Sequence, residues 1–409
     1  GKSLMLNLQP YENPQYFVYL IIALLPVIIG MFKGFRMHWY ESIFSLVFLV
    51  LIFDADKWPQ GKALLGYVVF NLLLVYAYFK YRTREGSKNS TAVFYLSVAL
   101  GIAQLAVVKF TPLFQHHGSI LGFLGISYLT FRVVGTIMEI RDGSIKDLNM
   151  WKFIQFLLFF PTISSGPIDR YRRFVKDYDR VPDPEHYAQL VTKAIHYLML
   201  GFLYKFILGY IFGTLWLPSV EHMAMASRGG AFLGLSWPVV GVMYAYSGYL
   251  FFDFAGYSLF AVAISYLMGI ETPMNFNKPW MSYNIKDFWN RWHMSLSFWF
   301  RDYIYMRFVF FMMKHKWIKS RVWTAFVGYL VLFLIMGIWH GETWYYIVYG
   351  LFHAMLINLT DAWLRFKKKH KDFFPHNRAT HYFAIFMTAN AVCFSFLIFS
   401  GFLDKLWFH

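Results

Sequence analysis

Charged residues are scarce in this sequence, and cysteine is almost absent. Only 15% of the 409 residues are charged, whereas about 25% is usual in soluble globular domains. The single cysteine, Cys393, cannot form a disulfide within the chain or supply a multi-cysteine zinc site. These shortages exclude a water-soluble globular enzyme and a disulfide-stabilised domain.

Three common catalytic motifs are also missing from the chain. The sequence contains no glycine-rich phosphate loop ending in Lys-Ser or Lys-Thr, no HExxH and no GxSxG. A nucleotide-driven pump, a zinc protease and a serine hydrolase therefore lack their usual signatures. We expect the chain to bind no metal and no cofactor of its own.

Apolar residues dominate what is present. Hydrophobic residues make up 58% of the chain and aromatic residues 22%, and the mean hydropathy is +0.43. About 20 apolar residues in helical form cross a bilayer. The sequence therefore predicts an all-α integral membrane protein of about eleven transmembrane helices, near residues 16–32, 40–53, 63–79, 91–108, 118–138, 187–217, 231–252, 254–270, 322–340, 343–363 and 382–403. The region 231–270 reads as two spans, or as one span and a half-helix, because Asp253 and Gly256 interrupt it.

Basic residues outnumber acidic ones by 38 to 22, which gives a net charge of +16. They occur in short clusters between apolar stretches, as in loops that orient membrane helices, and we predict contact with lipid and not with nucleic acid. The basic clusters lie at 33–36, 80–88, 141–152, 170–180, 314–321 and 367–371. Placing these clusters in the cytoplasm, with Asp54 and Asp56 outside, predicts a multi-pass cell-membrane protein with an external N-terminus.

Two segments mix polar residues with apolar ones. Residues 271–321 combine five tryptophans with asparagine, arginine and histidine, and residues 153–169 are broken by proline, serine and glycine. Polar groups at membrane depth must be paired or line a wet cavity, so these segments predict a polar core with re-entrant or partial helices. We also expect the segment Ser295 to Met313 to descend to the cytoplasm, because successive loops then lie on alternate faces of the membrane and the basic stretch from Lys314 is cytoplasmic. The whole chain, 1–409, is predicted to be one polytopic domain with its core signature at about 271–363.

Two histidines stand out from the fourteen. His293 lies in the polar and aromatic segment, and His340 ends an uncharged run that begins at Val322. A neutral imidazole accepts a proton from a hydroxyl at physiological pH, as acyl transfer to an alcohol requires. On the residues alone, a packing role for either histidine stays equally open. His353 has no polar neighbours in sequence and is predicted to be a packing residue.

The residues around these histidines resemble a known family. The segment WNRWHMSLSFWFRDY (Trp289 to Tyr303), followed by GIWHGETW (Gly337 to Trp344), is similar to the paired signature of membrane-bound O-acyltransferases. The resemblance implies that His340 is catalytic and that His293 is a second active-site histidine. We expect His340 to act as the general base. The supporting residues of this site are expected to be Asn290, Arg291, Trp292, Ser295, Arg301, Asp302 and Trp339.

Within the family, FFPTISSGPIDRYRRF (Phe159 to Phe174) resembles the branch that transfers D-alanine to teichoic acids in Gram-positive bacteria. The alternative is a polysaccharide O-acetyltransferase of the alginate-acetylase type. That branch usually continues its RDYxY element with Pro-Leu-Gly-Gly, whereas this chain continues with Met306-Arg307-Phe308. A transporter is a further alternative, but its typical pairing of interrupted helices in two halves is not found.

The resemblance implies a donor and several partners. The donor is a D-alanyl thioester on the phosphopantetheine arm of a small acidic carrier protein in the cytoplasm, and the final acceptor is a hydroxyl of lipoteichoic acid. Other membrane proteins of the Dlt system are implied as partners. An acidic carrier needs an apolar anchor beside cations. We predict that it docks on Met306, Val309, Phe310, Met313, Lys314, Lys316, Lys319 and Arg321.

Overall fold

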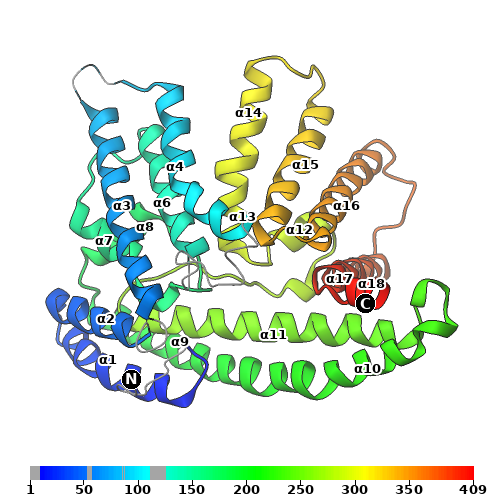
Figure 1. The fold of residues 1–409 in the computed structure, drawn as a ribbon, viewed down its shortest axis with the longest axis horizontal. Helices are drawn as coiled ribbons and strands as arrows, with labels where there is room; N and C mark the ends of the chain where they lie inside the picture. Colours follow the sequence, from blue (N-terminus) through cyan, green and yellow to red (C-terminus); the bar gives the residue numbers. More distant parts are fainter. Residues whose placement is uncertain (1–9, 53–57, 85, 87, 111–125) are drawn as a thin grey trace. The chain divides into compact units, whose positions relative to one another are not determined.

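The fold is described by a computed structural model that covers residues 10–52, 58–84, 86, 88–110 and 126–409. Every regular element in these ranges is helical, which confirms the predicted all-α class (Figure 1). The first helices are α1 (Pro14–Phe32), α2 (His38–Ile52), α3 (Trp58–Thr83), α4 (Thr91–Phe110), α6 (Ile126–Arg141), α7 (Met150–Leu157), α8 (Tyr171–Tyr178) and α9 (Pro184–Phe202). They are followed by α10 (Leu217–Ser227), α11 (Trp237–Leu267), α12 (Ile285–Trp289), α13 (Met294–Phe300), α14 (Met306–Lys314), α15 (Arg321–His340), α16 (Trp344–Lys369), α17 (Arg378–Phe399) and α18 (Phe402–Phe408).

The chain divides into two compact units. The first comprises Gly1–Gly201 and Tyr257–Pro273, and the second comprises Phe202–Gly256 and Met274–His409. Helix α11 contributes residues to both units. The assignment of the whole chain to one polytopic domain stays a prediction.

Seven helices in the described part are long and apolar enough to cross a membrane, and α2 and the first part of α4 are shorter apolar helices. These helices confirm a multi-pass membrane protein, whereas the number eleven stays a prediction. One expectation was wrong: the region 231–270 is neither two spans nor a span and a half-helix, because α11 runs unbroken over 31 residues. Asp253 does not end the helix, since its carboxylate accepts a hydrogen bond from the Lys205 ammonium at 2.8 Å. Paired charges are tolerated inside membrane helices.

The predicted break at 153–169 is found in the first unit. Helix α7 ends at Leu157, and the chain continues through the short 3₁₀ turn Phe160–Thr162. The buried Arg132 of α6 donates to the carbonyl oxygens of Phe156, Leu157 and Thr162 at 3.0, 2.9 and 2.8 Å. This confirms that the backbone groups released by the break find partners inside the protein, as apolar surroundings require.

Close helix packing builds the second unit, where Figure 1 shows α14, α15 and α16 following one another. A Cβ atom added to Gly350 would lie 2.2 Å from the Phe333 carbonyl oxygen, and one added to Gly337 would lie 2.5 Å from the Tyr346 carbonyl oxygen. Glycine therefore lets the α15 and α16 backbones touch, a common device in membrane helices. This contact fixes the end of α15, where His340 lies.

A second helical run, from Met294 to Lys314, is formed by α13, the π-helical turn Arg301–Tyr305 and α14. At 1.5 Å per residue it is about 30 Å long, which matches the thickness of a bilayer core. Its descent to the cytoplasm and the external N-terminus stay predictions. Asp54, Asp56 and residues 118–125 of one predicted span lie outside the described residues.

Candidate active site

His293 occupies a sharp turn between α12 and α13. Its backbone has φ 46° and ψ 50°, in the left-handed region that few residues other than glycine adopt. A hydrogen bond directly after His293 holds this turn: the Met294 N–H donates to the Asn275 carbonyl oxygen at 2.8 Å. The sequence thus places an imidazole at a strained position, which is typical of functional sites.

Asn275 also caps the first turn of α13. Its side-chain oxygen accepts hydrogen bonds from the Ser295 N–H at 3.2 Å and from the Ser295 hydroxyl. The first N–H groups of a helix lack partners within the helix, and His293 supplies no side-chain cap. Asn275, distant in sequence and fully buried, therefore provides the cap that His293 leaves open.

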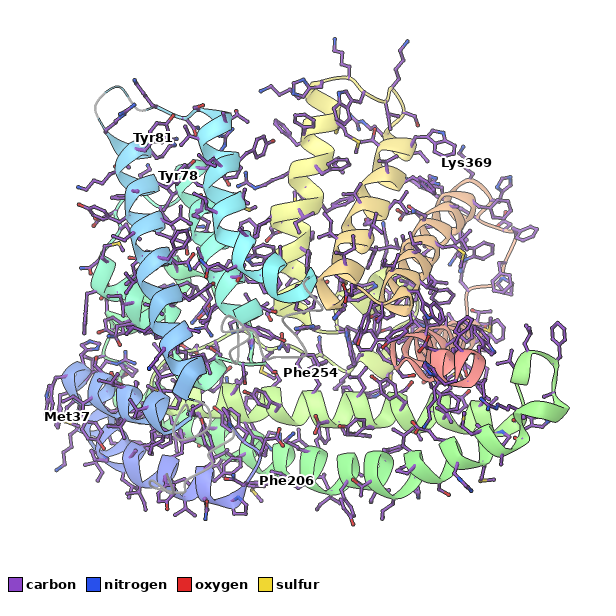
Figure 2. The ribbon with its side chains drawn as sticks, viewed as in Figure 1. Met37, Tyr78, Tyr81, Phe206, Phe254 and Lys369 are labelled. Atoms are coloured by element: carbon purple, nitrogen blue, oxygen red, sulfur yellow. The ribbon has the colours of Figure 1, made fainter. Side chains whose placement is uncertain are left out.

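Aromatic rings form the wall behind His293. Phe254 of α11, labelled in Figure 2, meets the imidazole edge to face with ring centroids 4.7 Å apart. Trp292 is buried between Phe276 and Phe396, at centroid distances of 5.0 and 4.9 Å. Phe254 contacts both Trp292 and His293, and the supporting role of Trp292 stays a prediction.

Burial favours the neutral form of the His293 ring. Its Nε2 atom is buried and has no hydrogen-bond partner within the described ranges. Burial lowers the pKa of His293 to about 3, and the nearby His340 adds to the lowering. A neutral imidazole keeps one nitrogen free to accept a proton or hydrogen bond and the other able to donate one.

His340 is the last residue of α15 and is partly exposed. Its ring lies 4.4 Å from Trp339 and 4.9 Å from Phe399, measured between centroids. Trp339 in turn lies 6.3 Å from Phe300 of α13. The two predicted histidines belong to the same unit, and ring contacts from His340 through Trp339 to Phe300 connect His340 to α13, the helix that begins directly after His293.

A third histidine, His353, lies between the segment that carries His293 and the helix that contacts His340. His353 of α16 is fully buried, as predicted for a packing residue, and its Nδ1 accepts a hydrogen bond from the Trp289 indole N–H at 3.2 Å. Tyr349 contacts both His353 and His340, with centroid distances of 4.8 and 6.1 Å. His353 therefore fixes Trp289, four residues before His293, against the helix that also faces His340.

Comparison with known proteins identifies the family of this chain. The profile of the membrane-bound O-acyltransferase family matches residues 138–401, which include both histidines. The chain belongs to the membrane-bound O-acyltransferase family. It is therefore an enzyme, a membrane-bound O-acyltransferase.

Relatives of this acyltransferase carry two different names. A teichoic acid D-alanyltransferase from Lacticaseibacillus rhamnosus is 96% identical over 99% of this chain and 100% of its own length. Another from Streptococcus thermophilus is 49% identical over 98% of this chain and 97% of its own length. A probable alginate O-acetylase from Pseudomonas aeruginosa is 31% identical and covers 58% of this chain and 42% of its own length.

Other predicted supporting residues of the acyltransferase form local contacts. Arg291 pairs with Asp287 at 2.9 Å and donates to the Asn277 carbonyl oxygen at 3.3 Å, so it stiffens the turn before His293. Arg301 pairs with its neighbour Asp302 at 2.9 Å. Asn290 is exposed and makes no hydrogen bond to His293 among the described residues.

A cavity of about 380 Å³ lies beside this turn. Its lining includes Trp289, Asn290, Arg301 and Met306, together with residues of α15 and α16. It thus extends from the foot of the His293 turn to the first residue of the predicted docking segment. Asn290 and Arg301 lie in this lining together with two other polar residues, Lys286 and Ser297, and the remaining lining residues are apolar or aromatic.

The predicted docking residues are mostly exposed. Phe310 is 70% exposed and Met306 is 55% exposed, and the cations from Lys314 to Arg321 lie in or beside the loop after α14. Val309 differs, because it packs against Gly328 of α15, where an added Cβ would lie 2.7 Å from a Val309 methyl group. Phe310 is therefore a better candidate anchor than Val309.

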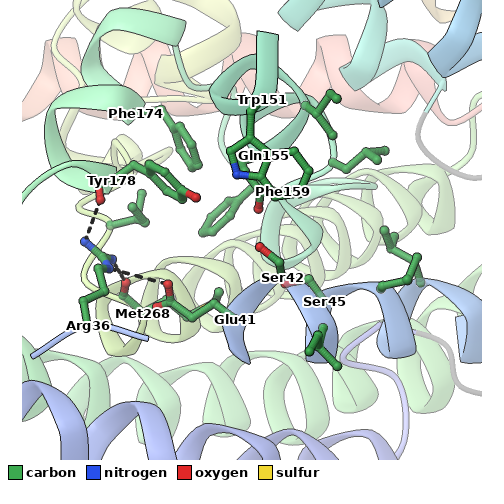
Figure 3. Close-up of a pocket in the computed structure, with 16 residues that line it drawn as sticks. Arg36, Glu41, Ser42, Ser45, Trp151, Gln155, Phe159, Phe174, Tyr178 and Met268 are labelled. Carbon is green, nitrogen blue, oxygen red and sulfur yellow. Dashed lines mark hydrogen bonds and ion pairs between the residues drawn. The ribbon is translucent and has the colours of Figure 1, made fainter. Parts of the chain in front are cut away.

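Another cavity, of about 400 Å³, lies in the first unit (Figure 3). None of the predicted site residues lines it. Arg36 at its edge donates to the Asp177 and Arg180 carbonyl oxygens at 2.6 and 2.7 Å and pairs with Glu41 at 3.6 Å. These bonds tie the α1–α2 connection to the chain around α8, which is a structural role.

The sequence did not identify Asn275 or Phe254 as site residues. Asn275 lies 18 residues before His293, and its place in the same polar segment was the only signal for it. Phe254 is one of 46 phenylalanines and carries no local signature. Both act by tertiary contact, which motif spacing does not encode.

Proposed function

We propose that this acyltransferase moves a D-alanyl group from a carrier-protein thioester to a hydroxyl of lipoteichoic acid. The observation that carries the proposal is the 96% identity, over almost the whole chain, to a teichoic acid D-alanyltransferase. The acetylase relative supports the family but covers only 58% of this chain. The sequence after Arg301-Asp302-Tyr303 also favours D-alanyl transfer, because α14 runs unbroken from Met306 where Pro-Leu-Gly-Gly would end a helix.

In the proposed reaction the acceptor hydroxyl oxygen attacks the carbonyl carbon of the thioester. His340 takes the hydroxyl proton as the carbon–oxygen bond forms. The carbon–sulfur bond then breaks, and the proton passes from His340 to the departing sulfur, which leaves as a thiol. Such positioned proton transfer contributes about 10²- to 10⁴-fold to a rate. The neutral His293 ring is proposed to polarise the carbonyl group or to position the acceptor.

The cavity beside the His293 turn supports an entry route for the pantetheine arm. Its lining includes Met306, which lies one helical turn before the exposed Phe310, and also Trp289 and Asn290, which precede His293 in the same turn. The cationic loop after α14 complements an acidic carrier, and Phe310 supplies an apolar anchor. We propose that the carrier docks on α14 and inserts its arm into this cavity. Lipoteichoic acid and other Dlt-system membrane proteins complete the proposed set of partners.

Donor choice tests this function. Purified enzyme in lipid vesicles is given the carrier loaded with either a D-alanyl or an acetyl thioester, and release of free carrier thiol is measured with a glycerol-phosphate acceptor. D-alanyl transfer should be much faster than acetyl transfer. Faster acetyl transfer would assign the enzyme to the acetylase activity instead.

A further inference from the structure

A third cavity, larger than the two described above, lies in the groove between α16 and α17. Its volume is about 660 Å³. It is lined along α16 from Leu356 to Lys367 and along α17 from Thr380 to Ala391, and the connecting loop closes one end. Neither His293 nor His340 lines it.

The lining of this groove changes character along its length. Lys367, His376 and His381 gather at the loop end, where Asn377 and Thr380 add further polar groups. Toward the other end the walls are mostly apolar, with Leu356, Leu359, Ala384, Met387 and Ala391; the hydroxyls of Thr360 and Thr388 there donate to backbone carbonyl oxygens of their own helices. The apolar part of α16, from Lys367 back to Leu356, is about 16 Å long at 1.5 Å per residue. The groove therefore offers one cationic end and one long apolar channel parallel to the helices.

Charge at the cationic end is not neutralised by the groove itself. No aspartate or glutamate is among the residues that line it. The Lys367 ammonium lies 6.0 Å from the centre of the Trp363 ring. Lys367 has no carboxylate partner among the ion pairs of the described residues. Lys368 and Lys369, the last residues of α16, and Lys371 of the loop add three positive charges nearby, against one carboxylate, Asp372, in the same loop; Lys369 is labelled in Figure 2. An anionic group is the complement of this end.

We propose that this groove is a binding site for one anionic phospholipid. The phosphate lies at Lys367, His376 and His381, and an acyl chain follows the apolar channel between α16 and α17. A free phosphate compound would leave the channel unfilled, and a zwitterionic lipid would gain less from the uncompensated cations. The site is independent of the acyl-transfer reaction, and its test does not depend on that reaction.

Native mass spectrometry of the purified full chain in detergent tests the proposal. Dioleoyl phosphatidylglycerol is titrated against dioleoyl phosphatidylcholine, which has the same chains and no net charge, and against glycerol 3-phosphate, which has the phosphate and no chain. We expect one saturable phosphatidylglycerol per protein. Equal binding of the two lipids, or equal binding of glycerol 3-phosphate, would overturn the proposal.

Matched variants locate the site. Lys367→Gln should weaken phosphatidylglycerol binding about fivefold, because one lysine near an anionic lipid contributes on the order of 1 kcal/mol. Lys368→Gln, which removes the same charge outside the groove lining, should leave binding nearly unchanged. Ala384→Phe should block the channel, whereas Ala379→Phe at an exposed position of the same helix should not. Equal losses in Lys367→Gln and Lys368→Gln would show diffuse attraction instead of a site. If Ala384→Phe fails to fold, the comparison of Lys367→Gln with Lys368→Gln still tests the proposal.

Discussion

At the scale of single residues, His293 combines an unusual backbone with a chemically free ring. A left-handed conformation costs a residue with a side chain about 1–2 kcal/mol relative to glycine. The turn is kept because Asn275 holds the following residues, and the ring is thereby fixed beside Phe254. A purely structural turn would be better served by glycine. The histidine itself is therefore the element to test.

Two substitutions of His293 distinguish the role of its imidazole ring from the role of its backbone turn. Both His293→Gly and His293→Asn keep a residue that tolerates the left-handed conformation. We expect both variants to fold with a thermal midpoint close to that of the parent, and to lose transfer by about 10²-fold or more. The measurement is D-alanyl transfer from the loaded carrier, with the midpoint recorded in the same detergent. Transfer near the parent rate in His293→Asn would contradict a role for the imidazole.

His353 gives a prediction about stability. His353→Phe leaves the buried Trp289 indole N–H without its acceptor, which costs about 1–3 kcal/mol. The thermal midpoint should fall. Adding Trp289→Phe should recover much of the loss, because removing both partners of a buried hydrogen bond is far less costly than removing one. Strictly additive losses in the double variant would show that the two residues are not coupled.

At the scale of elements, glycine contacts set the crossing of α15 and α16. Gly350→Ala would place a Cβ atom 2.2 Å from the Phe333 carbonyl oxygen, so the helices must separate. Overpacking of this kind costs about 1–3 kcal/mol. We expect a lower thermal midpoint and reduced transfer, since His340 lies at the end of α15. Gly66→Ala in α3, where an added Cβ meets nothing within 4 Å, should leave both unchanged.

Helix α14 carries the predicted docking surface. Phe310→Asp should weaken carrier binding strongly, because a buried apolar anchor contributes more affinity than charges at the rim. Binding is measured by titration with labelled carrier, and Phe373→Asp in the α16–α17 loop is a control at a similarly exposed phenylalanine, 64% against 70%. Val309→Asp is less suitable, because Val309 packs on Gly328 and the variant would also disturb α14. If Phe310→Asp binds the carrier as well as the parent does, the docking site is not on α14, and the basic cluster 170–176 becomes the next candidate.

Much of the helix pattern followed from the sequence, and its failures have physical causes. The spans near 16–32, 322–340 and 343–363 match α1, α15 and α16 because long apolar runs have few other stable forms in a membrane. The break expected at Asp253 does not occur, since Lys205 supplies a partner from another helix. A single sequence shows the charge but not the partner that compensates it.

At the scale of the whole molecule, the second unit contains every residue of the candidate site. His293, His340, His353 and Asn275 all belong to Phe202–Gly256 and Met274–His409. Motifs identified the two histidines because their neighbours are distinctive in sequence. Asn275 and Phe254 escaped prediction because they act only through the fold. The proposed account joins a donor on one side of the membrane to an acceptor on the other through this unit.

The most direct test of this account is D-alanyl transfer by His340→Ala. The enzyme is reconstituted in vesicles with the D-alanyl-loaded carrier and a lipoteichoic acid acceptor, and ester formation and carrier binding are measured on the same samples. The account predicts that carrier binding persists while the transfer rate falls by about 10²- to 10⁴-fold. A transfer rate close to that of the parent, with carrier binding intact, would contradict the central claim that His340 is the general base.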